Sequence, residues 1–303
     1  METIINKKIS LKNTAVCLGS FDGIHLGHQQ LINSMKLKAK EYGLKSTVFT
    51  FYNHPATMVK GRELPRYLMN NEQKIEVLKS FGIDFLYMMS FDEGLMKMDP
   101  ENFVKDILVN RLNAKYVVVG YNYRFGYKGK GDTDMLKKFG QEYGFQVEVI
   151  SPVQKNSKII SSTLIRSLIN EGNIIEANSL LGRKYSIKGN VIKGRGRGKG
   201  LGFRTANLGL GTDYVIPKFG VYKTYSLING DEYLSITNVG QNPTFGDKGI
   251  NIETHIYDFQ EDIYGENIEV RFDSFVRGER KYNSREDLIK QVMKDMEIVK
   301  GCK

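Results

Sequence analysis

Two histidines stand three residues apart in a glycine-punctuated segment near the start of the chain, GSFDGIHLGH. His25 and His28 can donate imidazole hydrogen bonds, and Gly19 and Gly27 allow backbone amides to face a ligand. A short apolar run, Ala15 to Leu18, precedes the segment, and an amphipathic stretch follows it. A loop that leads from a strand into the amino terminus of a helix favours anions, so the pattern indicates a triphosphate site. An ordinary connection with two surface histidines is the alternative.

Zinc is a weaker interpretation of these histidines, because no third ligand lies at a suitable spacing. The remaining histidines are His54 and His255, and Cys17 and Cys302 are the two cysteines. Two cysteines so placed build neither a disulfide framework nor a zinc cluster.

A second candidate segment, ISSTLIR, opens a helix much later in the chain. Ser162 and Thr163 offer hydroxyl groups, and Arg166 offers a guanidinium one turn further on, which together suit phosphate oxygens. A serine cap on an amphipathic helix is the alternative.

Two loops combine aromatic rings with positive charge. One is TFYNHP at 50–55, and the other is GYNYRFGYKGKGD at 120–132, where Phe125 and three tyrosines alternate with Arg124 and two lysines. Stacking surfaces beside cations suit a flavin phosphate, and they suit RNA bases equally well.

The stretch at 194–207, GRGRGKGLGFRTAN, offers backbone amides and cations to phosphates. Thr205 and Asn207 at its end carry oxygen atoms that could coordinate Mg²⁺. A flexible basic hairpin or an RNA-binding tract is the alternative.

The elements that must position these residues alternate between strand and helix in the first half. Strands are predicted at 15–18, 47–51, 84–89, 115–119 and 146–150, and helices at 28–42, 71–81, 99–112 and 132–143. Five strands joined by right-handed crossovers make a Rossmann-like, doubly wound parallel sheet of the α/β class. Its ligands lie beyond the carboxyl ends of the strands, where the candidate loops begin.

The second half has a different pattern of predicted secondary structure. Two short helices, 162–170 and 173–181, form a bridge, and short alternating runs from Arg183 onward predict an antiparallel β-barrel. Ser284 caps a closing amphipathic helix over 284–299. The predicted domains are therefore 1–182, including the bridge, and 183–303.

Composition restricts the class of protein. The 303 residues carry a net charge of +10, which favours phosphorylated or other polyanionic partners. No apolar run approaches the roughly 20 residues of a membrane span, and the first residues lack the apolar core of a signal peptide. We therefore expect a cytoplasmic protein that does not bind membranes.

The first two motifs together resemble the nucleotidylyltransferase superfamily. The resemblance implies that His25, His28, Ser162, Thr163 and Arg166 bind the triphosphate of ATP. The same resemblance extends the nucleotide site to Gly19, Phe21 and Gly27. The two aromatic loops resemble the flavin-specific branch of the superfamily, which implies a flavin site at His54, Asn122, Arg124 and Phe125.

The stretch at 194–207 resembles the riboflavin kinase signature, in which a glycine-rich flap leads into Pro-Thr-Ala-Asn. Further motifs follow in that family's order, at 238–240, 243–245 and 253–255. The resemblance implies that Glu253 is the general base toward riboflavin and that Thr205 and Asn207 bind Mg²⁺. It also implies that Gly194, Lys199 and Gly200 bind the nucleotide.

In combination, the motifs resemble the prokaryotic bifunctional riboflavin kinase and FMN adenylyltransferase family. This family uses riboflavin, FMN and ATP as small-molecule substrates, makes FAD, and binds no nucleic acid. The chain departs from the pattern where Asn53, Lys199 and Arg204 replace proline, arginine and proline. Two alternatives stay open: a monofunctional FAD synthetase with an impaired kinase domain, and an RNA-binding protein. The oligomeric state is also left open, a weak homo-oligomer included.

Overall fold

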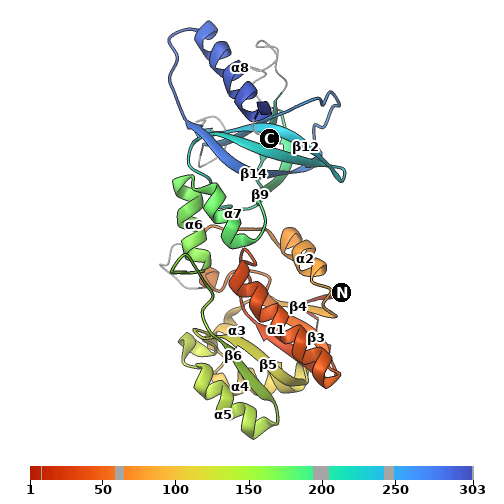
Figure 1. The fold of residues 1–303 in the computed structure, drawn as a ribbon. Coiled ribbons are helices and arrows are strands. Elements are labelled where there is room, and N and C mark those ends of the chain that lie inside the picture. The colour runs from red at the N-terminus through yellow and green to blue at the C-terminus, as the bar shows by residue number, and fades with distance from the viewer. Residues whose placement is uncertain (8, 59–64, 194–204, 242–248, 302–303) are drawn as a thin grey trace. The chain divides into compact units, whose positions relative to one another are not determined.

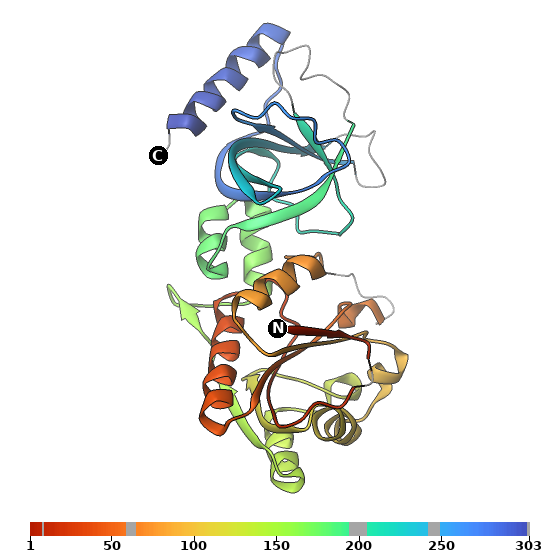
Figure 2. The same cartoon turned by 90° about the vertical axis from the view of Figure 1, so that its right-hand side faces the viewer.

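A computed structural model describes residues 1–7, 9–58, 65–193, 205–241 and 249–301. The chain forms two compact units, one from Met1–Pro65 and Asn71–Ser161 and the other from Arg66–Asn70 and Ser162–Lys303 (Figures 1 and 2). The two helices of the predicted bridge thus belong to the second unit, and the main division follows Ser161. That the two activities map to 1–182 and 183–303 stays a prediction.

The first unit contains a six-stranded parallel sheet in the order β1-β4-β3-β2-β5-β6. Its strands are β1 (Glu2–Ile5), β2 (Thr14–Leu18), β3 (Lys45–Phe51), β4 (Phe85–Met89), β5 (Ala114–Gly120) and β6 (Gln146–Ile150). Five of these were expected, and the Rossmann-like sheet is confirmed. The sixth, β1, is an edge strand that pairs with β4, Ile5 lying opposite Met88.

Helices and short turns connect these strands. They are α1 (Leu26–Tyr42), η1 (Pro55–Met58), α2 (Asn71–Ser80), α3 (Glu93–Lys97), α4 (Pro100–Asn102), the π-helix η2 (Phe103–Arg111), η3 (Tyr127–Gly129) and α5 (Thr133–Tyr143). A two-stranded hairpin of β7 (Gln154–Lys155) and β8 (Lys158–Ile159) follows. Helix ends carry the expected signals: Asp132 caps α5 by accepting the Met135 amide at 2.9 Å, and Gly43 ends α1 with φ 64°.

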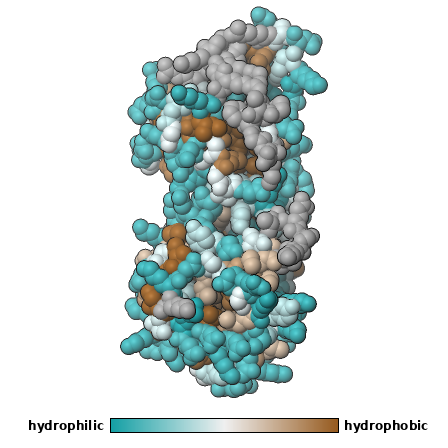
Figure 3. Space-filling model, turned by 180° about the vertical axis from the view of Figure 1, so that it is seen from behind, coloured by the Kyte–Doolittle hydropathy of each residue, from teal (hydrophilic) through white to brown (hydrophobic). Residues whose placement is uncertain are grey.

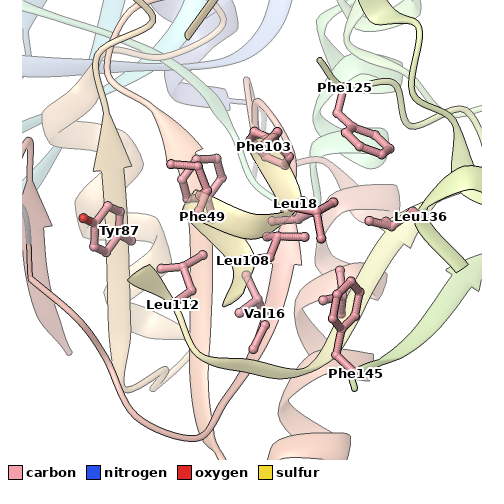
Figure 4. Close-up of a cluster of buried hydrophobic side chains, with 14 of the residues drawn as sticks. Val16, Leu18, Phe49, Tyr87, Phe103, Leu108, Leu112, Phe125, Leu136 and Phe145 are labelled. Atoms are coloured by element: carbon pink, nitrogen blue, oxygen red, sulfur yellow. The ribbon is translucent and has the colours of Figure 1, made fainter. Parts of the chain in front are cut away.

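The central strand β2 is buried along its whole length, since both faces of the sheet are covered. On one face Val16 and Leu18 pack in a cluster with Phe103 and Leu108 of η2 (Figure 4). Because side chains alternate along a strand, Cys17 points to the opposite face, where α1 contacts β2, β3 and β5. The layers hold the carboxyl ends of β2 and β5 side by side.

The second unit begins with α6 (Ser162–Glu171) and α7 (Ile174–Leu181). A closed antiparallel barrel follows, in the order β10-β13-β12-β11-β14-β9. Its strands are β9 (Tyr185–Ile192), β10 (Ala206–Gly209), β11 (Gly220–Ile228), β12 (Asp231–Gln241), β13 (Ile250–Ile256) and β14 (Asn267–Gly278), and α8 (Arg285–Gly301) follows them. The predicted barrel with a terminal helix is confirmed.

One region of the barrel is filled by buried hydroxyl groups. Thr237 donates to Thr254 at 2.9 Å, directly across the β12–β13 pair. Thr224 lies 2.7 Å from Thr237 and 2.8 Å from Ser235, and Ser226 donates to Ser235 at 3.0 Å. Each hydroxyl therefore has a partner inside the barrel, as buried polar groups require.

Helix α8 is anchored on the barrel by an ion pair. Arg277, near the end of β14, contacts Asp295 of α8 with Nη2 2.7 Å from Oδ2, and its Nε donates to both carboxylate oxygens at 2.9 and 3.0 Å. The Asp295 side chain is only 2% exposed. Beside it, Val299 packs in a small apolar cluster with Val221, and the helix is thereby fixed.

The face of the molecule seen in Figure 3 is mostly hydrophilic where residues are coloured, and groups of hydrophobic residues lie on both units. Within the residues that the structure describes, no helix is long and apolar enough to cross a bilayer.

Candidate active sites

The sheet order defines a switch point between β2 and β5. From β2 the chain builds outward through β3 and β4, whereas β5 and β6 extend the sheet on the other side. Ligands of open parallel sheets lie beyond the carboxyl ends of the strands at such a point. The histidine loop after Leu18 and the tyrosine-rich loop after Gly120 both start there.

The two histidines form a stacked pair at the head of α1. His25 is the N-cap residue, and its Nδ1 accepts the backbone N–H of His28 at 3.3 Å. The two rings stack with centroids 3.8 Å apart. Since Nδ1 of His25 accepts, its neutral tautomer carries the proton on Nε2, which is a hydrogen-bond donor suited to a phosphate oxygen.

The first turn of α1 contains no acidic residue, so the helix amino terminus keeps its partial positive charge. A Cβ atom on Gly27 would lie 3.1 Å from the His25 ring. A larger residue at position 27 would therefore crowd the ring of the capping His25.

Phe21 packs against His28 of the pair. It is buried with φ 48°, in the left-handed region that favours glycine, and Ile24 has φ 38°. The ring of Phe21 lies 5.2 Å from that of His28, and a Cβ on Gly19 would approach Phe21 to 3.1 Å. Phe21 thus lies between Gly19 and His28, and a direct contact of Gly19 or Phe21 with a nucleotide stays a prediction.

Sequence reasoning missed two buried charged residues, one in this loop and one that donates to it from α2. Lys74 of α2 is 8% exposed, and Asp22 is 4% exposed. The Lys74 Nζ donates to the Ser20 carbonyl at 3.0 Å. The sequence spacing could have indicated the burial of Lys74. This residue lies four positions before the buried Leu78 and therefore on the inward face of α2.

The three predicted flavin-binding residues of the tyrosine-rich loop differ in exposure. Asn122 and Arg124 are exposed, and Arg124 lies 3.5 Å from Asp132. Phe125 is instead 5% exposed and packs in the core with its ring 5.6 Å from that of Phe103 (Figure 4). Its position in the core accounts for its burial, and a contact with flavin stays a prediction.

The loop after β3 is held by Asn53, which stands where the related motif has proline. Its Nδ2 donates to the Phe91 carbonyl at 3.0 Å, and its Oδ1 accepts the Phe91 amide at 2.7 Å. The neighbouring His54 accepts the Ala56 amide at Nδ1, 3.1 Å away, which again places the proton of the neutral ring on Nε2. An amide side chain thus fixes a loop that a proline would otherwise restrict.

Ser162, Thr163 and Arg166 lie on the first turns of α6, in the second unit. Arg166 donates from Nε to the Arg66 carbonyl at 2.9 Å. That these three residues bind the same triphosphate as His25 and His28 stays a prediction.

The barrel brings two predicted residues together. Asn207 of β10 and Glu253 of β13 are directly opposite in the antiparallel ladder, so their side chains share one face. Glu253 is partly exposed, whereas Asn207 is 5% exposed. The partly exposed Thr205 comes just before β10.

The donor set fits a hard cation. The Oδ1 atom of Asn207 is buried without a hydrogen-bond partner among the described residues. An amide oxygen of this kind is a suitable ligand for Mg²⁺, and the Thr205 hydroxyl offers a second oxygen. The structure describes no cluster of three or more His, Cys, Asp or Glu side chains that could hold a metal. At this site the described residues offer the oxygen atoms of Asn207 and Thr205, with the Glu253 carboxylate on the same face as Asn207.

Three predicted nucleotide ligands, Gly194, Lys199 and Gly200, lie outside the described residues, as does Arg204.

Comparisons with known proteins cover both units. The family model described as FAD synthetase matches residues 7–164, and the model described as riboflavin kinase matches residues 181–302. A bifunctional riboflavin kinase/FMN adenylyltransferase from Listeria monocytogenes is 40% identical over 285 residues, which are 93% of this chain and 90% of that protein. A protein of the same description from Escherichia coli K12 is 32% identical over 92% of this chain and 89% of its own length.

A solved structure named macrolide-efflux protein, from Streptococcus pneumoniae, has a TM-score of 0.91 and 32% sequence identity. The match covers 99% of each chain. The fold of this chain is thus shared along its whole length with a solved structure.

Proposed function

Because this chain belongs to the bifunctional riboflavin kinase/FMN adenylyltransferase family, we propose that it performs its two reactions at two separate sites. The chain phosphorylates riboflavin to FMN with ATP, and it adenylylates FMN to FAD with release of pyrophosphate. One observation supports the division: the FAD synthetase model covers the histidine pair, and the riboflavin kinase model covers Asn207 and Glu253. Neither the monofunctional nor the RNA-binding alternative is favoured by a finding.

Adenylyl transfer requires positive potential more than a base. A phosphate oxygen of FMN attacks the α-phosphorus of ATP in line, and the bond to the pyrophosphate oxygen breaks. Phosphate is already a nucleophile, so alignment and charge stabilisation supply the catalysis. His25, through Nε2–H, and His28 would donate to the triphosphate, and the first amides of α1 would add partial positive charge.

The remaining predicted residues complete this site in our proposal. Ser162, Thr163 and Arg166 would bind the outer phosphates, and His54, Asn122 and Arg124 would bind the flavin or its phosphate. The exposure of Asn122 and Arg124 at the carboxyl end of β5 supports this assignment.

Phosphorylation of riboflavin requires a base beside the phosphates. The terminal ribityl hydroxyl attacks the γ-phosphorus of ATP, its proton passes to a Glu253 carboxylate oxygen, and ADP leaves. Asn207 through Oδ1 and Thr205 through its hydroxyl would hold Mg²⁺, which when bound neutralises the phosphate oxygens. The cross-strand pairing of Asn207 with Glu253, which puts the two side chains on one face, supports these two proposed roles.

Two variants test the division of labour. Riboflavin and Mg-ATP are supplied, and FMN, FAD and ADP are separated over time. We expect Glu253→Ala to abolish FMN formation while added FMN is still converted to FAD, and we expect His28→Ala to do the reverse. Glu261→Ala, an exposed glutamate of the second unit, serves as the matched control for Glu253. Equal loss of both reactions in both folded variants would contradict the division.

The requirement for ATP supports a cytoplasmic location in our proposal. Magnesium dependence, the lack of nucleic-acid and membrane partners, and the oligomeric state stay predictions.

A further inference from the structure

The buried ammonium group of Lys74 has a defined environment in the first unit. Its Nζ donates to the Ser20 carbonyl at 3.0 Å, and Asp22 is the nearby opposite charge. Burial lowers the pKa of Lys74, and the Asp22 carboxylate acts in the opposite direction. Lysine is rarely buried to this degree unless it is paired, so an interaction inside the protein must offset the cost of removing the ammonium group from water.

That interaction is with a strained segment. Between Ser20 and His25 the chain places two buried non-glycine residues, Phe21 and Ile24, at positive φ. Such conformations persist only where the surrounding structure holds them, and they concentrate at functional sites. The segment leads directly into the His25 cap.

Two side chains from different elements hold the start of the segment. The Ser20 carbonyl accepts Lys74 Nζ from α2 and also Thr50 Oγ1 from β3, each at 3.0 Å. Gln29 holds the end of the segment, because its Nε2 donates to the Ile24 carbonyl at 3.0 Å. The orientation of the Ser20 carbonyl fixes the following peptide, and through it the ring of Phe21 under His28.

We propose that Lys74 is a positioning residue for adenylyl transfer, which holds the Ser20–Ile24 segment so that His25 and His28 stack at the amino terminus of α1. The assignment rests on the proposed function of this unit. Lys74 also places a positive charge near the Asp22 carboxylate, which belongs to the same segment. Lys74 acts through the loop and touches no reacting atom.

Lys74→Met keeps the aliphatic stem but removes the donor and the charge. We expect its kcat for converting FMN and ATP to FAD to fall by about 100-fold, because a small displacement of aligned groups has effects of that size. The KM for FMN should change by less than about threefold, since the flavin loops keep their own contacts. The riboflavin kinase activity of the same molecule, which depends on the other unit, should stay unchanged.

Three further proteins make the test decisive. Lys79→Met replaces an exposed lysine of the same helix and should leave both activities unchanged. Thr50→Val removes the other donor to the Ser20 carbonyl and should also lower the adenylylation kcat selectively. Because both side chains act on one carbonyl, we expect the effects in the Lys74→Met/Thr50→Val double variant to be non-additive.

The possible outcomes distinguish a failure of the role proposed for Lys74 from a failure of the function proposed for the unit. If Lys74→Met keeps a wild-type kcat for adenylylation, or loses kinase activity in parallel, Lys74 is not a positioning residue. If Lys74→Met does not fold, the adenylylation kcat of Thr50→Val provides the same test. If instead the wild-type protein releases no pyrophosphate from FMN and ATP, the proposed function of the unit is wrong.

Discussion

Asn207 and Glu253 face each other across the β10–β13 ladder, so a buried amide oxygen and a partly exposed carboxylate share one face of the barrel. Directly opposed residues in an antiparallel pair have Cβ atoms about 5 Å apart. The separation suits a cation held by the amide and a hydroxyl group that loses its proton to the carboxylate.

Asn207→Ala removes the proposed cation ligand without changing the base. We expect the Mg²⁺ concentration for half-maximal riboflavin phosphorylation to rise about tenfold or more. FMN adenylylation by the same protein should keep its wild-type rate. A magnesium titration of both activities checks this, with Asn190→Ala, an exposed asparagine of the neighbouring β9, as the control. An unchanged titration would remove Asn207 from the metal site.

Asn53→Ala removes two hydrogen bonds to the Phe91 backbone. Together these bonds are worth about 1–2 kcal/mol, so the loop that carries His54 should lose its fixed position. We expect the KM for FMN in adenylylation to rise about tenfold while the kinase is unaffected. Initial rates at varied FMN measure this, and Asn33→Ala on the exposed side of α1 is the matched control. A KM equal to that of Asn33→Ala would show that the loop does not depend on Asn53.

Asp295→Ala leaves the Arg277 guanidinium largely buried without its carboxylate partner. Loss of one member of a buried pair costs about 3–5 kcal/mol, so α8 should detach from the barrel at lower denaturant concentration. Hydrogen exchange of α8 and urea unfolding measure the effect. Glu297→Ala, exposed on the same helix, should behave as wild type. Recovery of most of the lost stability in Arg277→Met/Asp295→Leu would identify the unpaired charge as the cause.

Asp84 predicts a pH-dependent contribution to stability. Burial acts to raise the pKa of this carboxyl, but hydrogen bonds from the Ser46 hydroxyl at 2.6 Å and amide at 2.9 Å, together with Lys45, outweigh it and lower the pKa. A depressed pKa contributes stability at pH values above about 4, the unfolded value, and the contribution is lost as the pH falls through the folded value.

We therefore expect Asp84→Asn to lower the free energy of unfolding at pH 7 by at most about 1 kcal/mol, because the group is partly exposed. The difference from wild type should shrink between pH 5 and pH 3. Urea unfolding at each pH measures it, with the exposed Asp106→Asn as the control. A difference that grows toward low pH would reverse the assigned direction.

Local patterns predicted most of the fold. The strands around Val16 and Val117 contain short apolar runs and the one around Val48 is rich in β-branched and aromatic residues, and the structure confirms all three. The edge strand β1 was missed because it has four residues and takes its place through backbone bonds to β4, a partner about 80 residues away. The π-helical form of residues 103–111 likewise depends on packing, since the apolar spacing there predicted only a helix.

The candidate sites also contain some features that the local sequence predicts and others that depend on packing. The stacking of His25 on His28 follows from a capped helix start, which is a local property. The burial of Phe125 was not predictable, because an aromatic residue among tyrosines and cations looks like a stacking surface until the core beneath is known. Lys74 was missed for the opposite reason, since lysine is ordinarily solvated.

The hydroxyl groups inside the barrel have a consequence for its assembly. A hydrocarbon interior is non-directional and accepts a strand in neighbouring alignments at modest cost, whereas Thr237 and Thr254 bond only when their strands are in step. If β13 slid by two residues, Thr237 and Thr254 would no longer be opposite each other, and the hydrogen bond between them would be lost. Glu253 immediately precedes Thr254, so the same bond also fixes where the candidate base lies along β12, while the β10–β13 pairing sets its separation from Asn207.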